Sequence, residues 1–386
     1  MAIARPLHEQ RILDLLRRYP VVAILGARQA GKTTLARQIA AARPSTFFDL
    51  EDRQQAATLD EPTLTLDRLR GLVVLDEIQR RPELFPTLRV LADRPRTPAR
   101  FLVLGSASVD LLRQSSESLA GRIAFHELPG LSLEEVGLRN VERLWLRGGF
   151  PRSYTARSDA TAAEWRQQFI RTFLERDLPQ LGIALPAGLL ERFWTMLAHY
   201  HGQVWNASEL ARSFGVAHTT VARWLEALTG TFVVELLRPW AENVGKRVVK
   251  SPKVYVADSG LVHSLLGLRS RDDVERHPKL GASWEGFVLG ELRKHLRADR
   301  RECYFWATHA GAELDFLVVR GNLRRGFEIK RTDAPRLTPS MQSAITTLGL
   351  QSLDVIHAGS STFALAPHVR AVAVRRMLED IEPLGW

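Results

Sequence analysis

A run of apolar residues that ends in a glycine-rich loop constrains this chain more than any other stretch. Residues 21–25 are apolar and of strand length, and the letters GARQAGKT that follow match the pattern GxxxxGK[ST]. Residues 34–42 then carry apolar side chains at helical spacing. A strand, a turn with two glycines and a helix bring backbone N–H groups together at the helix start, where they can bind phosphate oxygens. The stretch therefore predicts a site for the phosphates of a nucleotide.

The loop pattern also gives its residues their chemical roles. Lys32 places a positive charge at the β- and γ-phosphates, and the hydroxyl of Thr33 is placed to ligate Mg²⁺. The expected cofactors are therefore ATP and Mg²⁺. The residues expected to bind ATP are Gly26, Ala27, Arg28, Gln29, Ala30, Gly31, Lys32, Thr33 and Thr34.

Two further strand ends supply polar groups to the same site. The apolar run 72–75 ends in Asp76 and Glu77, of which we expect Asp76 to hold Mg²⁺ and Glu77 to polarise the attacking water. The strand expected at 100–105 is followed by Ser106, whose hydroxyl could sense the γ-phosphate or hold that water. Ligands of parallel sheets bind at the carboxyl ends of the strands, where these side chains all fall. For Ser106 the alternative is a strand that simply ends in a turn.

Composition bounds the class of protein and its partners. The 386 residues suffice for two or three domains, and 53 Lys and Arg against 43 Asp and Glu give a net charge of +10, which suits an anionic partner such as nucleic acid. No apolar run reaches the ~18 residues of a membrane span, so no membrane partner is expected. A single cysteine, Cys303, excludes an internal disulfide framework. The first residues lack a signal peptide's apolar segment, and we expect a cytoplasmic protein.

Strands that alternate with helices predict an α/β fold with a parallel sheet. Through GARQAGKT, LDEIQ, GSAS and LAGR, residues 1–130 resemble the ATPase core of the AAA+ superfamily of P-loop ATPases. The resemblance implies a homo-oligomer in a hexamer-like ring, with Arg122 as an arginine finger reaching the neighbouring subunit's ATP. It also implies a helical lid at 131–185, with Pro151 of the GGFP stretch near the adenine. A surface or salt-bridging arginine is the alternative for Arg122.

Residues 186–265 have the pattern of a winged helix. A short helix at 207–214 and a second helix from residue 218 flank a glycine turn, and two strand-like segments with a basic turn between them follow. Arg238 and Lys253 add positive charge to this region. The alternative is a winged helix that binds protein. The residues expected to contact DNA are His218, Thr219, Thr220, Arg223, Lys246, Arg247 and Lys250.

Residues 266–386 place carboxylates and a lysine on neighbouring strands. Glu313 and Asp315 open one strand of an expected hairpin, and Glu328 and Lys330 lie on one face of its partner. Acids that hold a metal ion beside a lysine are what Mg²⁺-dependent phosphodiester cleavage requires. The segment resembles the PD-(D/E)xK nuclease fold. A tentative metal site is expected at Asp315 and Glu328, with Lys330 beside them and Glu285 from a helix; the alternative is an inactive fold in which these charges are merely paired.

Along nearly its whole length, the chain resembles a prokaryotic family of AAA+ ATPases with a C-terminal domain of unknown function. The motifs that carry this resemblance are GARQAGKT, LDEIQ, GSAS, LAGR, GGFP, PKVYVADSGL, GAELDF and FEIK. The expected function is an ATP-hydrolysing machine that acts on DNA, with branched or recombination DNA as the expected substrate. Two alternatives stay open: an ATP-dependent switch that controls a protein partner, and an ATP-regulated, metal-dependent DNA nuclease.

Overall fold

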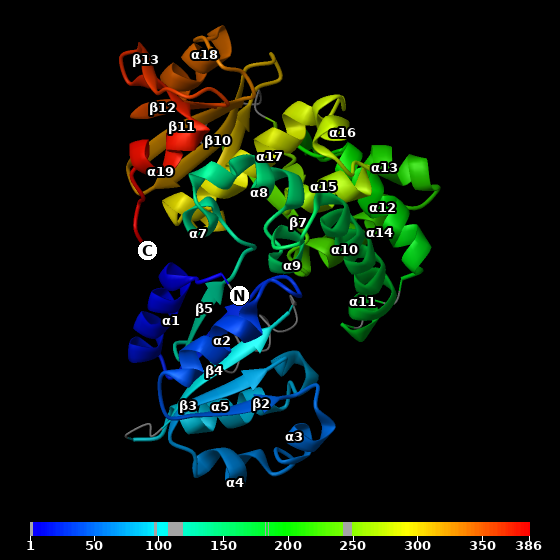
Figure 1. Cartoon of the computed structure of the whole chain (residues 1–386), viewed down its shortest axis with the longest axis vertical. Helices are drawn as coiled ribbons and strands as arrows, with labels where there is room; N and C mark the ends of the chain where they lie inside the picture. Colours follow the sequence, from blue (N-terminus) through cyan, green and yellow to red (C-terminus); the bar gives the residue numbers. More distant parts are fainter. Residues whose placement is uncertain (1–2, 96–98, 107–118, 182, 184, 242–248) are drawn as a thin grey trace. The chain divides into compact units, whose positions relative to one another are not determined.

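The computed structural model of the chain describes residues 3–95, 99–106, 119–181, 183, 185–241 and 249–386, which form two compact units (Figure 1). The first unit comprises Met1–Gly130 with Gly230–Phe232, and the second comprises Leu131–Thr229 with Val233–Trp386. The expected divisions at residues 185 and 265 both fall inside the second unit.

The first unit is built on a parallel sheet with the strand order β2-β3-β4-β1-β5. Its strands are β1 (Val21–Leu25), β2 (Ser45–Asp49), β3 (Gly71–Asp76), β4 (Ala99–Gly105) and β5 (Ile123–Glu127). All of β1 is buried, as a continuous apolar run predicts for a strand with both faces covered. The expected α/β fold with a parallel sheet is confirmed.

Helices cover both faces of this sheet. The helices α1 (Pro6–Arg18) and α2 (Lys32–Ala41) share a hydrophobic cluster with Val22, whereas α5 (Leu84–Ala92) shares another with Val21. Successive side chains of a strand point to opposite faces, so adjacent residues of β1 enter different layers. The shorter helices of this unit are α3 (Arg53–Ala57), α4 (Pro62–Asp67) and η1 (Ile78–Arg80).

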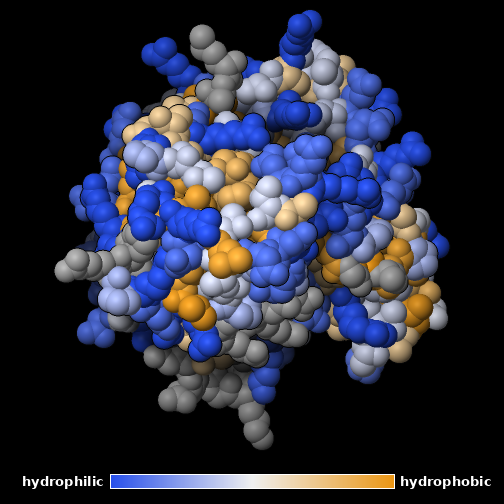
Figure 2. Space-filling model, turned by 90° about the horizontal axis from the view of Figure 1, so that it is seen from below, coloured by the Kyte–Doolittle hydropathy of each residue, from blue (hydrophilic) through white to orange (hydrophobic). Residues whose placement is uncertain are grey.

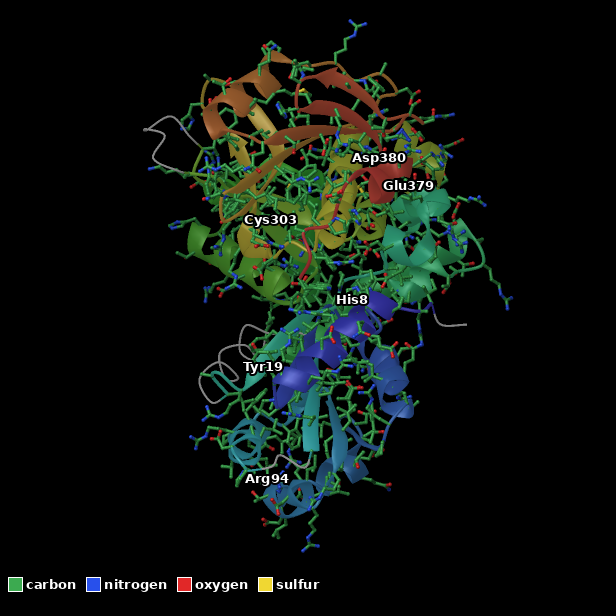
Figure 3. The ribbon with its side chains drawn as sticks, turned by 90° about the vertical axis from the view of Figure 1, so that its left-hand side faces the viewer. His8, Tyr19, Arg94, Cys303, Glu379 and Asp380 are labelled. Atoms are coloured by element: carbon green, nitrogen blue, oxygen red, sulfur yellow. The ribbon has the colours of Figure 1, made fainter. Side chains whose placement is uncertain are left out.

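Buried polar contacts hold α1 and the residue before it in place. Arg5 donates hydrogen bonds to the carbonyl oxygens of Ala30 (3.2 Å) and Pro129 (3.0 Å). His8, which lies on α1 (Figure 3), has its Nδ1 2.9 Å from Nε2 of His126 on β5. Burial lowers the pKa of His126 to about 4, so this ring is neutral at physiological pH.

Among the described residues, the second unit contains a mixed sheet with the order β13-β14-β12-β11-β10-β9-β7-β8-β6. Its strands are β6 (Gln203–Val204), β7 (Val234–Pro239), β8 (Lys253–Val256), β9 (Cys303–Ala307), β10 (Glu313–Arg320), β11 (Leu323–Lys330), β12 (Ser352–His357), β13 (Phe363–Ala366) and β14 (Val369–Ala373). The strand β7 pairs with β8 on one side and with β9 on the other, where Arg238 lies opposite Tyr304. The strands that follow the helix-turn-helix therefore join the C-terminal strands in one sheet.

The helices of the second unit flank this sheet and precede it. They are α7 (Leu133–Val136), η2 (Leu138–Asn140), α8 (Val141–Arg147), α9 (Pro151–Tyr154), α10 (Asp159–Thr172), the π-helical turn η3 (Phe173–Asp177), α11 (Leu178–Gln180), α12 (Ala187–His199), α13 (Ala207–Phe214), α14 (His218–Gly230), α15 (Ser259–Leu265), α16 (Arg271–Glu275), α17 (Leu280–Leu296), η5 (Arg300–Glu302), α18 (Pro339–Leu348), η6 (Val374–Arg376) and α19 (Met377–Asp380).

The pair α13 and α14 has the expected helix–turn–helix order. The N-cap of α13 is Asn206, whose side chain accepts the N–H of Glu209 at 3.3 Å, as asparagine commonly does at this position. Gly215 ends the helix in the left-handed conformation, with φ of 66°. Phe193 of α12 packs edge-on against Trp224 of α14.

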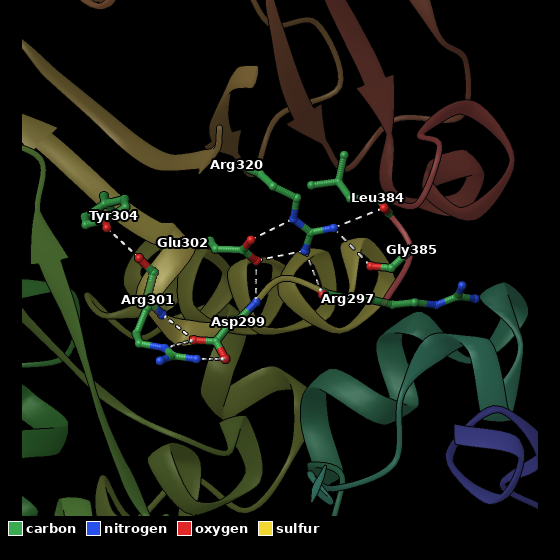
Figure 4. A network of polar contacts seen from close by, with 8 residues as sticks. All are labelled: Arg297, Asp299, Arg301, Glu302, Tyr304, Arg320, Leu384 and Gly385. Carbon is green, nitrogen blue, oxygen red and sulfur yellow. Dashed lines mark hydrogen bonds and ion pairs between the residues drawn. The ribbon is translucent and has the colours of Figure 1, made fainter. Parts of the chain in front are cut away.

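The hairpin of β10 and β11 anchors the end of the chain as well as the sheet. The two strands pair antiparallel from Phe316 opposite Phe327, so the predicted hairpin is confirmed. The guanidinium of Arg320 on β10 pairs with Glu302 at 2.7 Å and donates to the carbonyl oxygen of Leu384 at 3.0 Å (Figure 4). The single thiol, Cys303 on β9, is buried and free.

The outer surface mixes polar and apolar residues. On the face that Figure 2 shows, hydrophobic residues gather in small patches between hydrophilic ones. Within the described ranges, no helix combines the length and apolar character that a membrane crossing requires.

Candidate functional site

The loop between β1 and α2 has two positions that favour glycine. Gly26 has a φ of 155°, and a Cβ there would lie 2.3 Å from the carbonyl oxygen of Leu128. Gly31, directly before α2, has a φ of 99°. A side chain would strain either position, so the two glycines of the motif allow the loop to turn into the start of α2. The non-glycine residue Gln29 also has a positive φ, 64°.

Lys32 is buried at the first position of α2, with its ammonium turned into the loop. Its Nζ donates hydrogen bonds to the carbonyl oxygens of Gly26 and Ala27, both at 2.9 Å. Burial lowers the pKa of Lys32 to about 8, against the opposing effect of the carboxylates Glu77 and Asp76. Phosphate oxygens can take over from the two carbonyls as acceptors, and a charged acceptor makes the stronger hydrogen bond.

Asp76 and Thr33 together provide oxygen ligands of the kind that Mg²⁺ takes. Asp76 ends β3 and is buried. Burial raises its pKa to about 6, whereas a hydrogen bond from Thr33 lowers it. A hydroxyl and a carboxylate in direct contact, beside the loop lysine, form a donor set that fits the Mg²⁺ of bound ATP.

Glu77 follows Asp76 in a strained conformation and meets Ser106 from the next strand. Its φ is 56°, which is uncommon for a residue with a side chain. Ser106 Oγ lies 2.6 Å from each carboxylate oxygen of Glu77, and the side-chain amide of Gln79 also donates to this carboxylate. The sequence placed Glu77 and Ser106 at the carboxyl ends of two strands, which the structure shows to be neighbours. It did not identify Gln79 as a partner, although Gln79 belongs to the LDEIQ stretch.

A carboxylate between two arginines borders the loop and was missed by the sequence analysis. Glu51, just after β2, pairs with Arg28 of the loop and with Arg80, each at 3.1 Å. Burial raises the pKa of Glu51, but the hydrogen bonds and charges of the two arginines together hold it below its ordinary value. The acidic end of β2 was the available signal. The sequence does not show which cations Glu51 contacts, because this depends on how the strands pack in the sheet.

Arg122 and Pro151 belong to different units. Arg122 is partly exposed and pairs with Asp93 of its own chain, which matches the salt-bridging alternative in the isolated chain. Its action on a neighbouring subunit stays a prediction. Pro151 is the first residue of α9. Gly149, two positions before Pro151, donates its N–H to the Asp258 carboxylate at 2.6 Å. The contact of Pro151 with adenine also stays a prediction.

On the hairpin of the second unit, two buried acids share one lysine. Lys330 Nζ lies 2.8 Å from a carboxylate oxygen of Glu328 and 3.9 Å from one of Asp315. The Asp315 carboxylate also accepts the N–H of Ile329 at 2.8 Å. Burial raises the pKa of Glu328 to about 7, and the charge of Asp315 adds to this effect. The structure therefore brings Asp315, Glu328 and Lys330 together as expected.

A second lysine, from β8, joins the same acids. Lys253 Nζ contacts Glu313 and lies 3.4 Å from an oxygen of Glu285 on α17, which also accepts the hydroxyl of Tyr255 at 2.7 Å. Burial and the charge of Asp315 raise the pKa of Glu285. Across the described residues, no three His, Cys, Asp or Glu side chains are grouped so that they could hold a metal ion. The tentative metal site stays a prediction.

The residues expected to bind DNA are partly visible. His218, Thr219 and Arg223 are exposed on α14, Thr220 is half-buried beside them, and Lys250 is exposed before β8. Lys246 and Arg247 lie outside the described residues. Lys253, counted from the sequence among the positive charges of the wing, is 4% exposed. That expectation was wrong for Lys253, because its side chain points into the acidic cluster instead of into solvent.

The glycine loop, its buried lysine and the parallel sheet define a P-loop NTPase of the AAA type. Residues 18–137 match the family described as AAA domain. Residues 138–272 and 280–377 match two domains of unknown function, DUF8612 and DUF4143. The chain belongs to the same family as the uncharacterized proteins Rv2008c of Mycobacterium tuberculosis and Mb2031c of Mycobacterium bovis. It is 51% identical to each over 378 residues, which cover 98% of this chain and 85% of each relative.

Similarity to solved structures is more distant. The walker-type ATPase paby2304 of Pyrococcus abyssi is 16% identical, with a TM-score of 0.48 over 68% of this chain and 96% of that chain. The signal transduction ATPase PH0952 of Pyrococcus horikoshii is 12% identical, with a TM-score of 0.30 over 76% of this chain and 45% of that chain. Scores this low carry no functional argument.

Proposed function

We propose that the protein hydrolyses ATP and uses the cycle to act on DNA, as a ring-shaped oligomer whose ATP site is completed by Arg122 of a neighbour. The observation that carries ATP hydrolysis is the meeting of Glu77 and Ser106 beside the loop lysine, with Ser106 Oγ at 2.6 Å from the carboxylate. A binding loop alone would need only Lys32 and the backbone N–H groups. Hydrolysis also needs a group that orients the attacking water, and the carboxylate of Glu77 supplies it.

Each residue of the site has a distinct task in this reaction. Lys32 exchanges its two carbonyl acceptors for phosphate oxygens. Thr33 and Asp76 hold Mg²⁺, which when bound supplies positive charge to the β- and γ-phosphate oxygens. Asp76 is mostly ionised at neutral pH, because its pKa of about 6 lies below 7. Ser106 and Gln79 hold Glu77 in place. When Glu77 exchanges one of these donors for the attacking water, its carboxylate accepts a hydrogen bond from the water and orients it.

Three features support an action on DNA. The net charge of +10 favours an anionic partner. The helices α13 and α14 have helix-turn-helix order, and such motifs read DNA with the N-terminal residues of the second helix. His218 and Thr219 at that end of α14, and Arg223 one turn later, are exposed.

Oligomerisation through the ATP site is supported by the position and exposure of Arg122. Its ion pair with Asp93 lies at the surface, with the arginine side chain 37% exposed. Surface ion pairs contribute little to stability, so this one can be exchanged at little cost for a phosphate of a neighbouring subunit.

The test is the ATPase rate without DNA and with single-stranded, duplex or four-way DNA. We expect at least one of these to stimulate turnover, and we expect Arg223→Ala to reduce the stimulation. Arg212→Ala is the matched control, because Arg212 is exposed on α13, the first helix of the pair, and it should keep the stimulation. A rate that no DNA changes would contradict the proposal.

The rival function is an ATP-dependent switch whose winged helix binds a protein. The burial of Lys253 favours this rival, since it leaves the wing region with one cation fewer for phosphates. ATP hydrolysis that is indifferent to every DNA, together with a nucleotide-dependent protein complex, would support the switch.

A further inference from the structure

The acidic cluster of the second unit is built from more of the chain than its hairpin. Glu313 and Asp315 lie on β10, Glu328 on β11 and Glu285 on α17, whereas Lys253 comes from β8, some sixty positions before the hairpin. Lys253 is 4% exposed. Its ammonium lies 3.4 Å from Glu285 and in contact with Glu313.

The strand β8 supplies a hydrogen-bond donor as well as this cation. Tyr255 is two positions after Lys253, so both side chains leave β8 on the same face. Its hydroxyl donates to the Glu285 oxygen that also faces Lys253, at 2.7 Å. Burial lowers the pKa of Lys253, but Glu285, Asp315 and Glu313 raise it above its ordinary value. The ammonium therefore stays charged across the physiological range.

Each acid of the cluster faces at least one donor of the protein. Lys330 and the N–H of Ile329 hold Asp315 and Glu328, whereas Lys253 and Tyr255 hold Glu285. One oxygen of Glu328 is buried without a hydrogen-bond partner. A divalent ion needs six or more oxygens, waters included, directed at one point within about 2.0–2.6 Å. The described side chains form no such group of three His, Cys, Asp or Glu ligands.

We propose that Lys253 is the resident cation of this cluster. Its ammonium compensates these acids where a divalent ion would otherwise be needed, and the site is closed to Mg²⁺ and Mn²⁺ while Lys253 remains between Glu285 and Glu313. The acidic cluster of the second unit is then built around an internal lysine instead of a metal ion. This inference concerns the second unit alone and stands or falls independently of ATP hydrolysis.

The test measures Mn²⁺ binding to the full chain. The electron paramagnetic resonance signal of free Mn²⁺ reports how much of the ion remains unbound. Every protein carries Asp76→Asn, which removes the carboxylate of the ATP site. To this parent we add Lys253→Met, which removes the ammonium but keeps an apolar stem of similar length. Lys250→Met is the matched control, since Lys250 is exposed three positions earlier on the same segment.

We expect Lys253→Met alone to bind Mn²⁺ about tenfold more tightly, or more, than the parent. The gain should disappear when Asp315→Asn is added. Mn²⁺ should also raise the melting temperature of Lys253→Met and leave that of the parent unchanged.

Two results would overturn the proposal. One is Mn²⁺ binding by the parent that Asp315→Asn abolishes, because the site would then be open with Lys253 in place. The other is a folded Lys253→Met protein without any gain. If Lys253→Met does not fold, the same gain in Mn²⁺ affinity is expected of Lys253→Gln. Titration of the parent with Mn²⁺ can still refute the proposal by itself.

Discussion

The two units each hold a buried lysine near carboxylates, but the lysines have different acceptors. In the first unit, the Lys32 ammonium donates to two backbone carbonyl oxygens, and Asp76 and Glu77 have hydroxyl and amide partners. In the second unit, Lys253 and Lys330 lie directly against carboxylates. The same residue types therefore make one site that can receive phosphate and Mg²⁺, and one whose acids already face lysines.

This difference separates the effects of substitution in the two places. A carbonyl that loses an ammonium stays neutral, whereas a buried carboxylate that loses its cation keeps an uncompensated charge. Substitutions around the ATP site should therefore change turnover far more than stability. Substitutions of the lysines in the acidic cluster should change stability far more than turnover.

The largest expected effect is on turnover, from Arg122→Ala. If Arg122 reaches the ATP of a neighbour, its loss should reduce kcat by about 10³–10⁵-fold, the range known for arginine fingers. Mixing Arg122→Ala with Lys32→Ala protein should restore part of the activity, since mixed interfaces then combine an intact loop with an intact arginine. Asp93→Ala serves as the control, because it removes only the ion-pair partner. Normal turnover of a monomeric Arg122→Ala protein would show that the site is complete within one chain.

The second effect is that of Glu77→Gln on kcat. The substitution keeps the shape of the side chain but removes the charged acceptor, so turnover should fall by about 10²–10⁴-fold. ATP binding should persist, because Lys32 and the loop are unchanged. Lys32→Ala gives the opposite pattern, in which binding itself is lost. Isothermal titration and steady-state kinetics on the two variants distinguish these outcomes, and wild-type turnover in Glu77→Gln would remove Glu77 from the mechanism.

The third prediction compares the two lysines by the free energy of unfolding. Lys253→Met should lower it by about 2–4 kcal/mol, somewhat less than for a fully buried pair, because Glu313 is half exposed. Lys32→Met should lower it less, because the two hydrogen bonds lost by the carbonyls of Gly26 and Ala27 are offset by the relief of a buried ammonium's desolvation. Urea denaturation measures both. Equal losses would mean that the two lysines are not held differently.

Much of the first site could be predicted because its signals are local. A continuous apolar strand, two glycines and the start of a helix lie within 14 consecutive positions, 21–34, and the fold only has to bring Asp76 and Ser106 to the same sheet edge. Parallel strands do this by construction. The hairpin of β10 and β11 could be predicted for the same reason, since period-two alternation and a short connection determine which acids meet.

The contacts that the sequence analysis missed depend on packing between distant segments. The pairing of β7 with β9 turns β8, and with it Lys253, toward the acids of the hairpin. In the sequence, Lys253 is one more positive charge beside Lys250. The pairing of Glu51 with Arg28 and Arg80 likewise needs three segments to meet. Charge alone does not reveal which side of a strand will be buried.

The fourth prediction uses the pKa of Asp76. Burial raises it to about 6, so the carboxylate takes up a proton as the pH falls through 6 and loses its charge for Mg²⁺. The value of kcat/KM for ATP, which reports the free enzyme, should therefore fall about tenfold per pH unit below 6. The negative charge of Asp49 contributes to the raised pKa, so Asp49→Asn should shift the midpoint to lower pH. A flat profile from pH 7 to 5 would contradict this assignment.

The smallest effect separates two lysines that lie three positions apart. Lys250 is exposed and Lys253 is buried among acids, so only Lys250 can neutralise a DNA phosphate. Each neutralised phosphate contributes about 0.9 to the slope of log K against log salt on duplex DNA. Lys250→Ala should therefore flatten that slope by about 0.9 and weaken binding across sequences, as Arg223→Ala should if its partner is a phosphate. Lys253→Gln, checked to be folded, should leave the slope unchanged, because its ammonium is already held by Glu285 and Glu313. Fluorescence anisotropy at several salt concentrations measures the slopes.

A loss of slope with Lys253→Gln as large as that with Lys250→Ala would show that Lys253 leaves the cluster when DNA binds. An unchanged slope in Lys250→Ala and Arg223→Ala would favour a protein partner for α14.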